Sequence, residues 1–310
     1  MKIIFMGSPE FAIPSLKKLV QAHQVLAVVT VPDKPAGRGR KVHMSAVKQL
    51  AHQLGLPILQ PEKLKNPDFI AQLKQYPAEL FVVVAFRILP EEIFTLPPRG
   101  TINLHASLLP QYRGAAPMNW ALINGETVTG VTTFFIEKAV DTGKLLLQQS
   151  VNIGPDMTAG ELHHQLSSLG AQVLMDTLSG IESDQLQPKP QIGPATLAPK
   201  LMKEFGEIDW SQSAAQIHNL VRGLSPNPGS YSYLKGKYLK ILRTSRDVPS
   251  LDSVKIPGVI VEIVKNGPIY VQTGYGIIAV MQLQPEGKKI MSTAEFVRGY
   301  HVQSGQQWGK

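Results

Sequence analysis

Apolar segments alternate with helix-like segments through the first half of the chain. Ile3 to Met6, Val25 to Val31 and Leu80 to Phe86 have strand length, and the third run is continuous, as in a parallel strand covered on both faces. After the first run, Ser8-Pro9 supplies an N-cap and a first-turn proline ahead of apolar residues at helical spacing. This alternation predicts an α/β domain with an open, mostly parallel, Rossmann-like sheet, whose site lies beyond the carboxyl ends of the strands.

Further elements continue the pattern. Ser45 to Leu54 is predicted to be a helix closed by Gly55, and strands are predicted at Thr101 to Ala106 and Val131 to Ile136. The sequence Thr158-Ala159-Gly160-Glu161 is a capping box, which predicts the start of a long helix running toward Leu178.

Residues 187–195 are rich in proline, a composition that is typical of a linker between domains. We therefore expect a catalytic domain at residues 1–189, a linker at 190–205 and a second domain at 206–310. The second domain begins with a helix predicted from Ser211 to Arg222 and closed by Gly223. Short β segments and turns follow, which favour a small closed or half-closed β-barrel, similar to an OB fold, with segments at 237–242, 258–264, 269–273 and 277–283.

Composition narrows the functional classes. Cysteine is absent from the 310 residues, which excludes disulfides, thiol nucleophiles and cysteine-based zinc sites. No apolar run approaches the ~20 residues that cross a bilayer, and the first residues form a strand pattern rather than a signal peptide, so we expect a cytoplasmic protein without a membrane partner. The formal net charge is +8. Residues 205–310 contribute most of it, because they contain 12 basic and 7 acidic side chains. This excess favours a polyanionic partner such as nucleic acid.

Common nucleotide and hydrolase motifs are missing. The turn after the first strand, Gly7-Ser8-Pro9-Glu10, has one glycine where a dinucleotide fingerprint has three. The sequence contains no GxxxxGK[ST], no HExxH and no GxSxG. Nicotinamide, flavin and nucleoside triphosphate binding are therefore not expected, nor is a serine nucleophile.

A polar trio marks the strand predicted at residues 101–106. Because side chains alternate along a strand, Asn103, His105 and Ser107 are expected on one face. Such a face is most often a satisfied polar network or a solvated edge. A second polar turn, Asp141-Thr142-Gly143, follows the strand predicted at 131–136, and by spacing alone it is a turn former. The spacing along the sequence does not tell whether Asp141 lies near His105.

The motifs together resemble the 10-formyltetrahydrofolate-dependent formyltransferases. The resemblance rests on NLHASLLPQYRGAAP from Asn103, on VDTG from Val140, on IIFMGSPEFA from Ile3 and on the loop PDKPAGRGRK from Pro32. The strand motif is shared by members with different acceptors. The basic loop, the length and the second domain, with IDWSQSAAQIHNLVRGLSPNPGSY and LQPEGKKIMSTAEFVRG, resemble the members that formylate methionyl-tRNA.

The resemblance implies transfer of the formyl group of 10-formyltetrahydrofolate to the α-amino group of initiator methionyl-tRNA. It implies that Asn103 and His105 donate hydrogen bonds to the oxyanion, and that Asp141 orients His105 and takes part in removing the amine proton. The folate-binding segment would be Ser107, Leu108, Leu109 and Pro110, and the tRNA-binding residues would be Lys34, Arg38, Arg40 and Lys41. We expect a monomer without a metal, since one histidine and one carboxylate make a poor ligand set.

One segment departs from the family pattern. Residues 85–90 read AFRILP, where many members have an aromatic residue followed by glycine and a longer segment, and this leaves the role of Arg87 open. Two other hypotheses remain. A formyltransferase acting on an amino sugar or sugar nucleotide would use the same strand motif without the basic loop. A non-catalytic RNA-binding protein would use the basic C-terminal third, and would be expected to lose the Asn103, His105 and Asp141 set.

Overall fold

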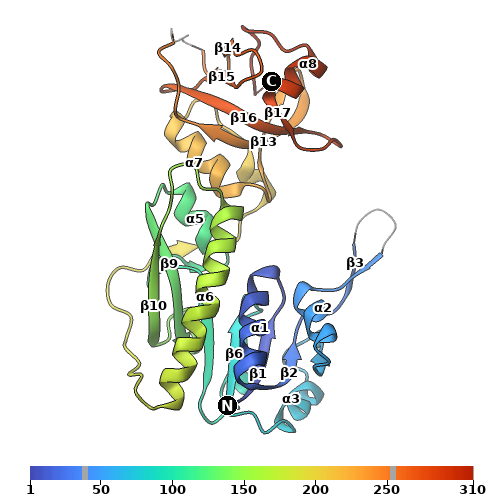
Figure 1. The fold of residues 1–310 in the computed structure, drawn as a ribbon, viewed down its shortest axis with the longest axis vertical. Coiled ribbons are helices and arrows are strands. Elements are labelled where there is room, and N and C mark those ends of the chain that lie inside the picture. The colour runs from blue at the N-terminus through green and yellow to red at the C-terminus, as the bar shows by residue number, and fades with distance from the viewer. Residues whose placement is uncertain (37–40, 252–255, 310) are drawn as a thin grey trace. The chain divides into compact units, whose positions relative to one another are not determined.

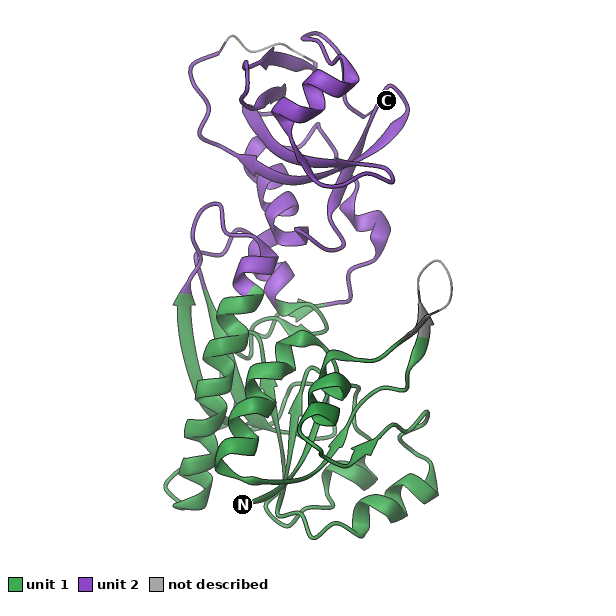
Figure 2. Ribbon diagram, turned by 45° about the vertical axis from the view of Figure 1, so that its right-hand side comes forward, with its two compact units in different colours: residues 1–117, 129–151, 163–198 green, residues 118–128, 152–162, 199–310 purple. Residues whose placement is uncertain are grey.

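The computed structural model describes residues 1–36, 41–251 and 256–309. The chain forms two compact units (Figure 2). Unit 1 comprises residues 1–117, 129–151 and 163–198, and unit 2 comprises residues 118–128, 152–162 and 199–310. In the described part of the chain, no helix is both long and apolar enough to span a bilayer.

Unit 1 is built on a seven-stranded sheet with the order β10-β9-β7-β6-β1-β2-β5 (Figure 1). The pairings of β1 with β2 and β6, of β2 with β5 and of β6 with β7 are parallel, whereas β7 pairs with β9 in antiparallel fashion. The mostly parallel sheet expected from the sequence is thereby confirmed. Its strands are β1 (Lys2–Gly7), β2 (Gln24–Val29), β5 (Ile58–Leu59), β6 (Leu80–Val84), β7 (Thr101–His105), β9 (Val128–Phe135) and β10 (Leu145–Asn152).

Helices cover both faces of this sheet. All five residues of β6 are buried, which explains why this strand is apolar without alternation. On one face, Phe69 and Leu73 of α3 pack with β6 side chains such as Phe81. On the other, α6 crosses β7 so closely that a Cβ on Gly170 would lie 2.8 Å from Leu104. The helices are α1 (Ile13–Ala22), α2 (Ala46–Gln53), α3 (Pro67–Lys74), α4 (Glu91–Phe94) and α6 (Ala159–Glu182).

Two helix starts match their sequence signals and one does not. The Ser45 hydroxyl accepts a hydrogen bond from the Lys48 backbone N–H, so it caps α2. The Thr158 and Glu161 side chains form the predicted capping box of α6. Ser8, however, does not cap α1, because a short 3-10 helix at Glu10–Ala12 intervenes and the Ser8 hydroxyl pairs with that of Thr30.

The direction in which the strands are added reverses beside β1. The chain runs from β1 outward to β2 and β5 on one side, and then returns to β6 and β7 on the other side of β1. Ligands of such sheets bind beyond the carboxyl ends of the strands, where the direction of winding reverses.

Two further pairs of short strands belong to unit 1: β3 (Lys34–Ala36) with β4 (Lys41–His43), and β8 (Arg113–Gly114) with β11 (Leu197–Ala198).

Unit 2 contains an antiparallel sheet with the order β12-β13-β16-β15-β14, to which β17 adds beside β16. The C-terminal segment connects the two edges, since Gln307 bridges to Val259 beside β14 and Trp308 bridges to Leu234 of β12. The predicted small barrel is therefore closed by residues that gave no strand signal. The strands are β12 (Ser230–Leu234), β13 (Lys237–Ser245), β14 (Ile260–Ile263), β15 (Ile269–Gln272), β16 (Ile277–Pro285) and β17 (Met291–Ser292).

The core of unit 2 is apolar and includes the fully buried Trp308 beside Trp210. Its helices are α5 (Pro117–Ile123), α7 (Ala214–Leu224) and α8 (Thr293–Tyr300). Gly223 was predicted to end the helix that became α7, but it lies within the helix. A Cβ at this position would lie 2.6 Å from the Ile123 side chain, so the glycine permits close packing rather than termination.

Candidate functional site

Strand β7 carries two of the candidate residues to the edge of the sheet. Leu104 is buried beneath α6, so Asn103 and His105 emerge on the opposite face, as strand alternation requires. The strand ends at His105, one residue earlier than predicted. Ser107 therefore follows the strand and does not belong to its alternating face.

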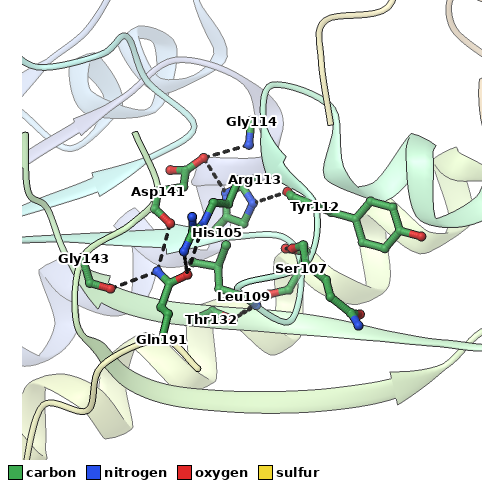
Figure 3. Close-up of polar contacts among 11 residues, drawn as sticks. His105, Ser107, Leu109, Tyr112, Arg113, Gly114, Thr132, Asp141, Gly143 and Gln191 are labelled. Atoms are coloured by element: carbon green, nitrogen blue, oxygen red, sulfur yellow. Dashed lines mark hydrogen bonds and ion pairs between the residues drawn. The ribbon is translucent and has the colours of Figure 1, made fainter. Parts of the chain in front are cut away.

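His105 is held by a backbone carbonyl (Figure 3). Its Nε2 lies 2.9 Å from the carbonyl oxygen of Tyr112, and the residue is 6% exposed. Since a carbonyl oxygen only accepts, Nε2 carries a proton and donates it to this bond. In a neutral imidazole, the free lone pair is then on Nδ1. The Phe134 ring packs edge-on against the imidazole, with centroids 6.5 Å apart.

Asp141 faces that free nitrogen. Its Oδ2 lies 3.8 Å from Nδ1 of His105, which is the distance of an ion pair rather than of a hydrogen bond. The same oxygen accepts a 2.9 Å hydrogen bond from the backbone N–H of Gly114. The backbone of Asp141 adopts a left-handed conformation with φ 54°. The tertiary structure thus brings together two residues whose proximity the spacing could not predict.

Asn103 lies beside His105 on the same face of β7 and is half-buried. It pairs across the sheet with Val83 of β6 and Phe134 of β9, both of which are apolar. Its place on β7, two residues before His105 on the same face, makes its carboxamide a suitable hydrogen-bond donor for an oxygen atom bound there.

The segment 107–110 is fixed by its neighbours in β9 and β10. The buried Ser107 hydroxyl donates a hydrogen bond to the Gln111 carbonyl at 2.6 Å. The Thr132 hydroxyl donates to the Ser107 carbonyl and accepts from the Leu109 N–H, while the Gln148 carboxamide donates to the Leu109 carbonyl. The loop shape is therefore specified by side chains from two strands that the motif itself does not contain.

The local sequence pattern did not mark Tyr112, Thr132, Gln148 and Gln191 as neighbours of the candidate residues. Gln191 donates to the carbonyls of Asp141 and Gly143 and accepts from the Arg113 guanidinium. The position of Tyr112, Arg113 and Gly114 within the NLHASLLPQYRGAAP motif gave a signal for this stretch. Nothing in the local pattern around Gln191 marked it.

The basic loop is only partly covered by the described residues. Lys34 is exposed on β3, and the β3–β4 pairing brings the backbone of Ala36 opposite that of Lys41. Arg38 and Arg40 lie outside the described residues, so the structure adds nothing to the prediction for them.

The unusual AFRILP segment acquires a structural role. The Arg87 guanidinium donates to the carbonyls of Pro61 and Glu62, at 2.8 and 3.0 Å, and lies 5.1 Å from the centroid of the Phe86 ring. Burial lowers the pKa of Arg87. Arg87 therefore ties the segment after β6 to the segment after β5.

Among the described residues, no group of three or more histidine, aspartate or glutamate side chains has an arrangement that could hold a metal ion.

Two stretches of the chain match known protein families. Residues 1–178 match the family described as formyl transferase, and residues 200–301 match the formyl transferase C-terminal domain. A methionyl-tRNA formyltransferase from Thermodesulfovibrio yellowstonii is 47% identical over 98% of this chain and 97% of its own length. One from Acetivibrio thermocellus is 46% identical over the whole of both chains.

Solved structures with lower identity share the fold. An N-formyltransferase from Helicobacter canadensis, in complex with folinic acid and dTDP-3-aminofucose, aligns with a TM-score of 0.66 at 20% identity, covering 92% of this chain and 99% of its own. HypX from Aquifex aeolicus in complex with tetrahydrofolic acid aligns with a TM-score of 0.65 at 17% identity, covering 96% of this chain and 47% of its own. The two matched domains and the near-complete overlap with relatives above 45% identity show that the chain belongs to the formyl transferase family, among its methionyl-tRNA formyltransferases.

Proposed function

We propose that this chain transfers the formyl group of 10-formyltetrahydrofolate to the α-amino group of initiator methionyl-tRNA, giving formylmethionyl-tRNA for translation initiation. The observation that carries this proposal is the identity of 46–47% over nearly the whole chain to proteins named methionyl-tRNA formyltransferase. The proximity of His105 and Asp141 at the carboxyl end of β7, with Asn103 two residues before His105 on the same strand, supports it.

The reaction needs one proton to move from the amine to the folate. The neutral amine attacks the formyl carbon, a C–N bond forms, and the carbonyl electron pair moves to oxygen. The Asn103 carboxamide is suited to donate a hydrogen bond to this oxyanion, where a fixed donor stabilises charge as it develops. Collapse of the oxyanion re-forms the carbonyl group and breaks the bond to N10. That nitrogen then receives a proton.

His105 and Asp141 offer a place for the proton between these steps. The Nδ1 lone pair of a neutral His105 faces the Asp141 carboxylate across 3.8 Å, so a proton taken from the ammonium group onto Nδ1 is stabilised by the adjacent negative charge. The resulting imidazolium also lies on the Asn103 face, where it favours the oxyanion. The Tyr112 carbonyl keeps Nε2 protonated and so leaves Nδ1 available for this role.

For folate we propose the segment Ser107 to Pro110. Since the Ser107 side chain is fully buried and its hydroxyl donates to Gln111, contacts with the folate would come from the backbone and from the apolar side chains of this segment. For tRNA we propose Lys34, Arg38, Arg40 and Lys41, because a short run of cations is suited to neutralise phosphates.

The test compares acceptors and variants in one assay. With 10-formyltetrahydrofolate and charged initiator tRNA, wild type should form formylmethionyl-tRNA, while His105→Ala and Asp141→Asn should lower kcat by about 10²–10³-fold, the usual cost of losing one stabilising group. tRNA affinity should be unchanged in both variants, because neither side chain is assigned to phosphate. Efficient formylation of a dTDP-amino sugar with no product on tRNA would show that the acceptor is an amino sugar. If wild type binds tRNA but forms no product, the chain is an RNA-binding protein without this activity.

A further inference from the structure

A single carboxamide joins the two loops that flank the candidate active site. The Nε2 group of Gln191 donates to the carbonyl oxygens of Asp141 and Gly143, each at 2.9 Å, and its Oε1 accepts from Nε and Nη2 of Arg113 at 3.1 and 2.6 Å (Figure 3). A carboxamide has two N–H donors and one oxygen with two lone pairs. All four are used, so the orientation of the amide is unambiguous.

One end of this bridge is bonded to the turn that carries Asp141, and the other end to the residue before Gly114, whose N–H contacts the Asp141 carboxylate. On one end, the hydrogen bonds span the turn that carries Asp141, whose left-handed backbone with φ 54° is unfavourable for a residue other than glycine. On the other end, Arg113 is followed by Gly114, whose N–H donates to the carboxylate. The turn therefore depends on contacts from outside its own segment.

The segment that carries Gln191 is itself anchored in unit 1. Lys189 forms a β-bridge with Leu145, and the Thr196 hydroxyl and carbonyl accept hydrogen bonds from the N–H groups of Tyr112 and Arg113. Anchored on both sides, Gln191 is held against the two loops rather than free to follow them.

We propose that Gln191 is a positioning residue for formyl transfer. It holds the Asp141 turn so that the carboxylate stays opposite Nδ1 of His105, and it acts through Asp141 without touching the substrates. This role rests on the proposed function, because it needs Asp141 to take part in the reaction.

Two substitutions separate the halves of the bridge. Gln191→Ala removes the hydrogen bonds to the Asp141 turn and those from Arg113. Gln191→Glu keeps the size and the acceptor for Arg113, but a carboxylate cannot donate to the carbonyls of Asp141 and Gly143. Both should lower kcat on the order of 10²-fold, as misplacement of a reacting group by about 1 Å does, and leave KM for charged tRNA and for 10-formyltetrahydrofolate within about twofold. Gln187→Ala, an exposed position in the same segment, is the matched control and should keep wild-type turnover.

A double-mutant cycle with Asp141→Asn distinguishes positioning from a general loss of structure. If Gln191 acts through Asp141, adding Gln191→Glu to Asp141→Asn should lower kcat by no more than about twofold further. If the two losses multiply, or if Gln191→Glu alone has wild-type kcat, the proposal is wrong. An Asp141→Asn variant with wild-type kcat would instead overturn the proposed role of Asp141. Thermal unfolding of each variant checks that the folded fraction is complete at the assay temperature.

Discussion

At the scale of single residues, the site is organised by backbone groups as much as by the motif side chains. His105 is oriented by a carbonyl oxygen, and the Asp141 carboxylate accepts from a backbone N–H. Tyr112 adopts a left-handed conformation, with φ 59°, at the residue whose carbonyl meets His105. Such conformations persist where the surroundings determine them, and they concentrate at functional sites.

The glycine of the Asp141 turn gives a prediction at this scale. A Cβ on Gly143 would lie 1.7 Å from the carbonyl oxygen of Phe135 and 2.9 Å from its carbon, and both are backbone atoms. Gly143→Ala must therefore displace the turn from β9. We expect a loss of about 1–3 kcal/mol in the free energy of unfolding, measured with denaturant, and a fall in kcat on the order of 10²-fold.

The control is a glycine in open space. Among the described residues, no atom outside the backbone of α8 lies within 4 Å of a Cβ added to Gly299, so Gly299→Ala should stabilise the protein by about 0.5–1 kcal/mol and keep the wild-type kcat. A Gly143→Ala variant with wild-type stability and kcat would show that the turn can move without affecting the reaction.

At the scale of elements, helix α7 is tied to the segment before α6 by a buried histidine. His218 is 2% exposed, its Nε2 donates to the Pro155 carbonyl at 2.9 Å, and its Nδ1 accepts from the Thr244 hydroxyl at 3.0 Å. Both bonds suit the neutral imidazole. Burial lowers the pKa of His218, and nearby Arg222 acts in the same direction, whereas the Pro155 carbonyl and Asp156 oppose the shift.

This lowered pKa predicts a loss of stability in mild acid. When the folded-state pKa lies below the unfolded value of about 6.5, the unfolded chain binds the proton more readily. The contribution of His218 to stability is therefore fully present above about pH 6.5 and is lost as the pH falls from there toward the folded-state pKa. Denaturant midpoints at pH 7.5, 6.5 and 5.5 should fall with pH in wild type. The fall should be smaller in His218→Asn, even though that variant is less stable throughout.

A pH slope that is the same in His218→Asn as in wild type would assign the effect to other groups. His163 in α6 also has a pKa lowered by burial and serves as the comparison. His163→Asn should reduce the slope independently, because His163 belongs to unit 1 and His218 to unit 2.

At the scale of the whole molecule, net charge bears on the acceptor. The chain carries +8, and the loop from Lys34 to Lys41 contains four basic residues without an acidic one. If this loop contacts phosphates, Arg38→Ala should weaken binding of charged tRNA. It should also flatten the plot of log K against log salt concentration by roughly one unit, since one fewer counterion is released. Folate affinity, measured by calorimetry, should not change.

Lys74→Ala is the matched charge control, because Lys74 is exposed at the end of α3 and is not assigned to tRNA. It changes net charge by the same amount and should leave the salt slope within error of wild type. Equal slopes for Arg38→Ala, Lys74→Ala and wild type would remove the loop from the tRNA contacts.

The sequence by itself determined the class of the fold and several of its elements. The continuous apolar run from Leu80 to Phe86 predicted a buried parallel strand, which the structure forms at Leu80–Val84. The helix expected from Ser45 and the capping box at Thr158 predicted helix starts that the structure confirms. These features are local, because side-chain alternation and capping involve residues within a few positions of one another. The motif residues also identified the family, since related proteins share a pattern of residue types that can be read without knowing where those residues lie in space.

Only the tertiary structure decided which residues meet. Asp141 reaches His105 across 36 positions of sequence, and Gln191 reaches Asp141 across 50, by contacts that no periodicity encodes. Gly223 was misread as a helix end because its close neighbour, Ile123, lies far away in the chain. The barrel likewise closes through residues 307 and 308, which pair with strands nearly 50 and more than 70 positions earlier. The physical reason is common to all of these cases: a hydrogen bond or packing contact depends on distance in space, and the chain sets that distance only after its strands and helices have packed.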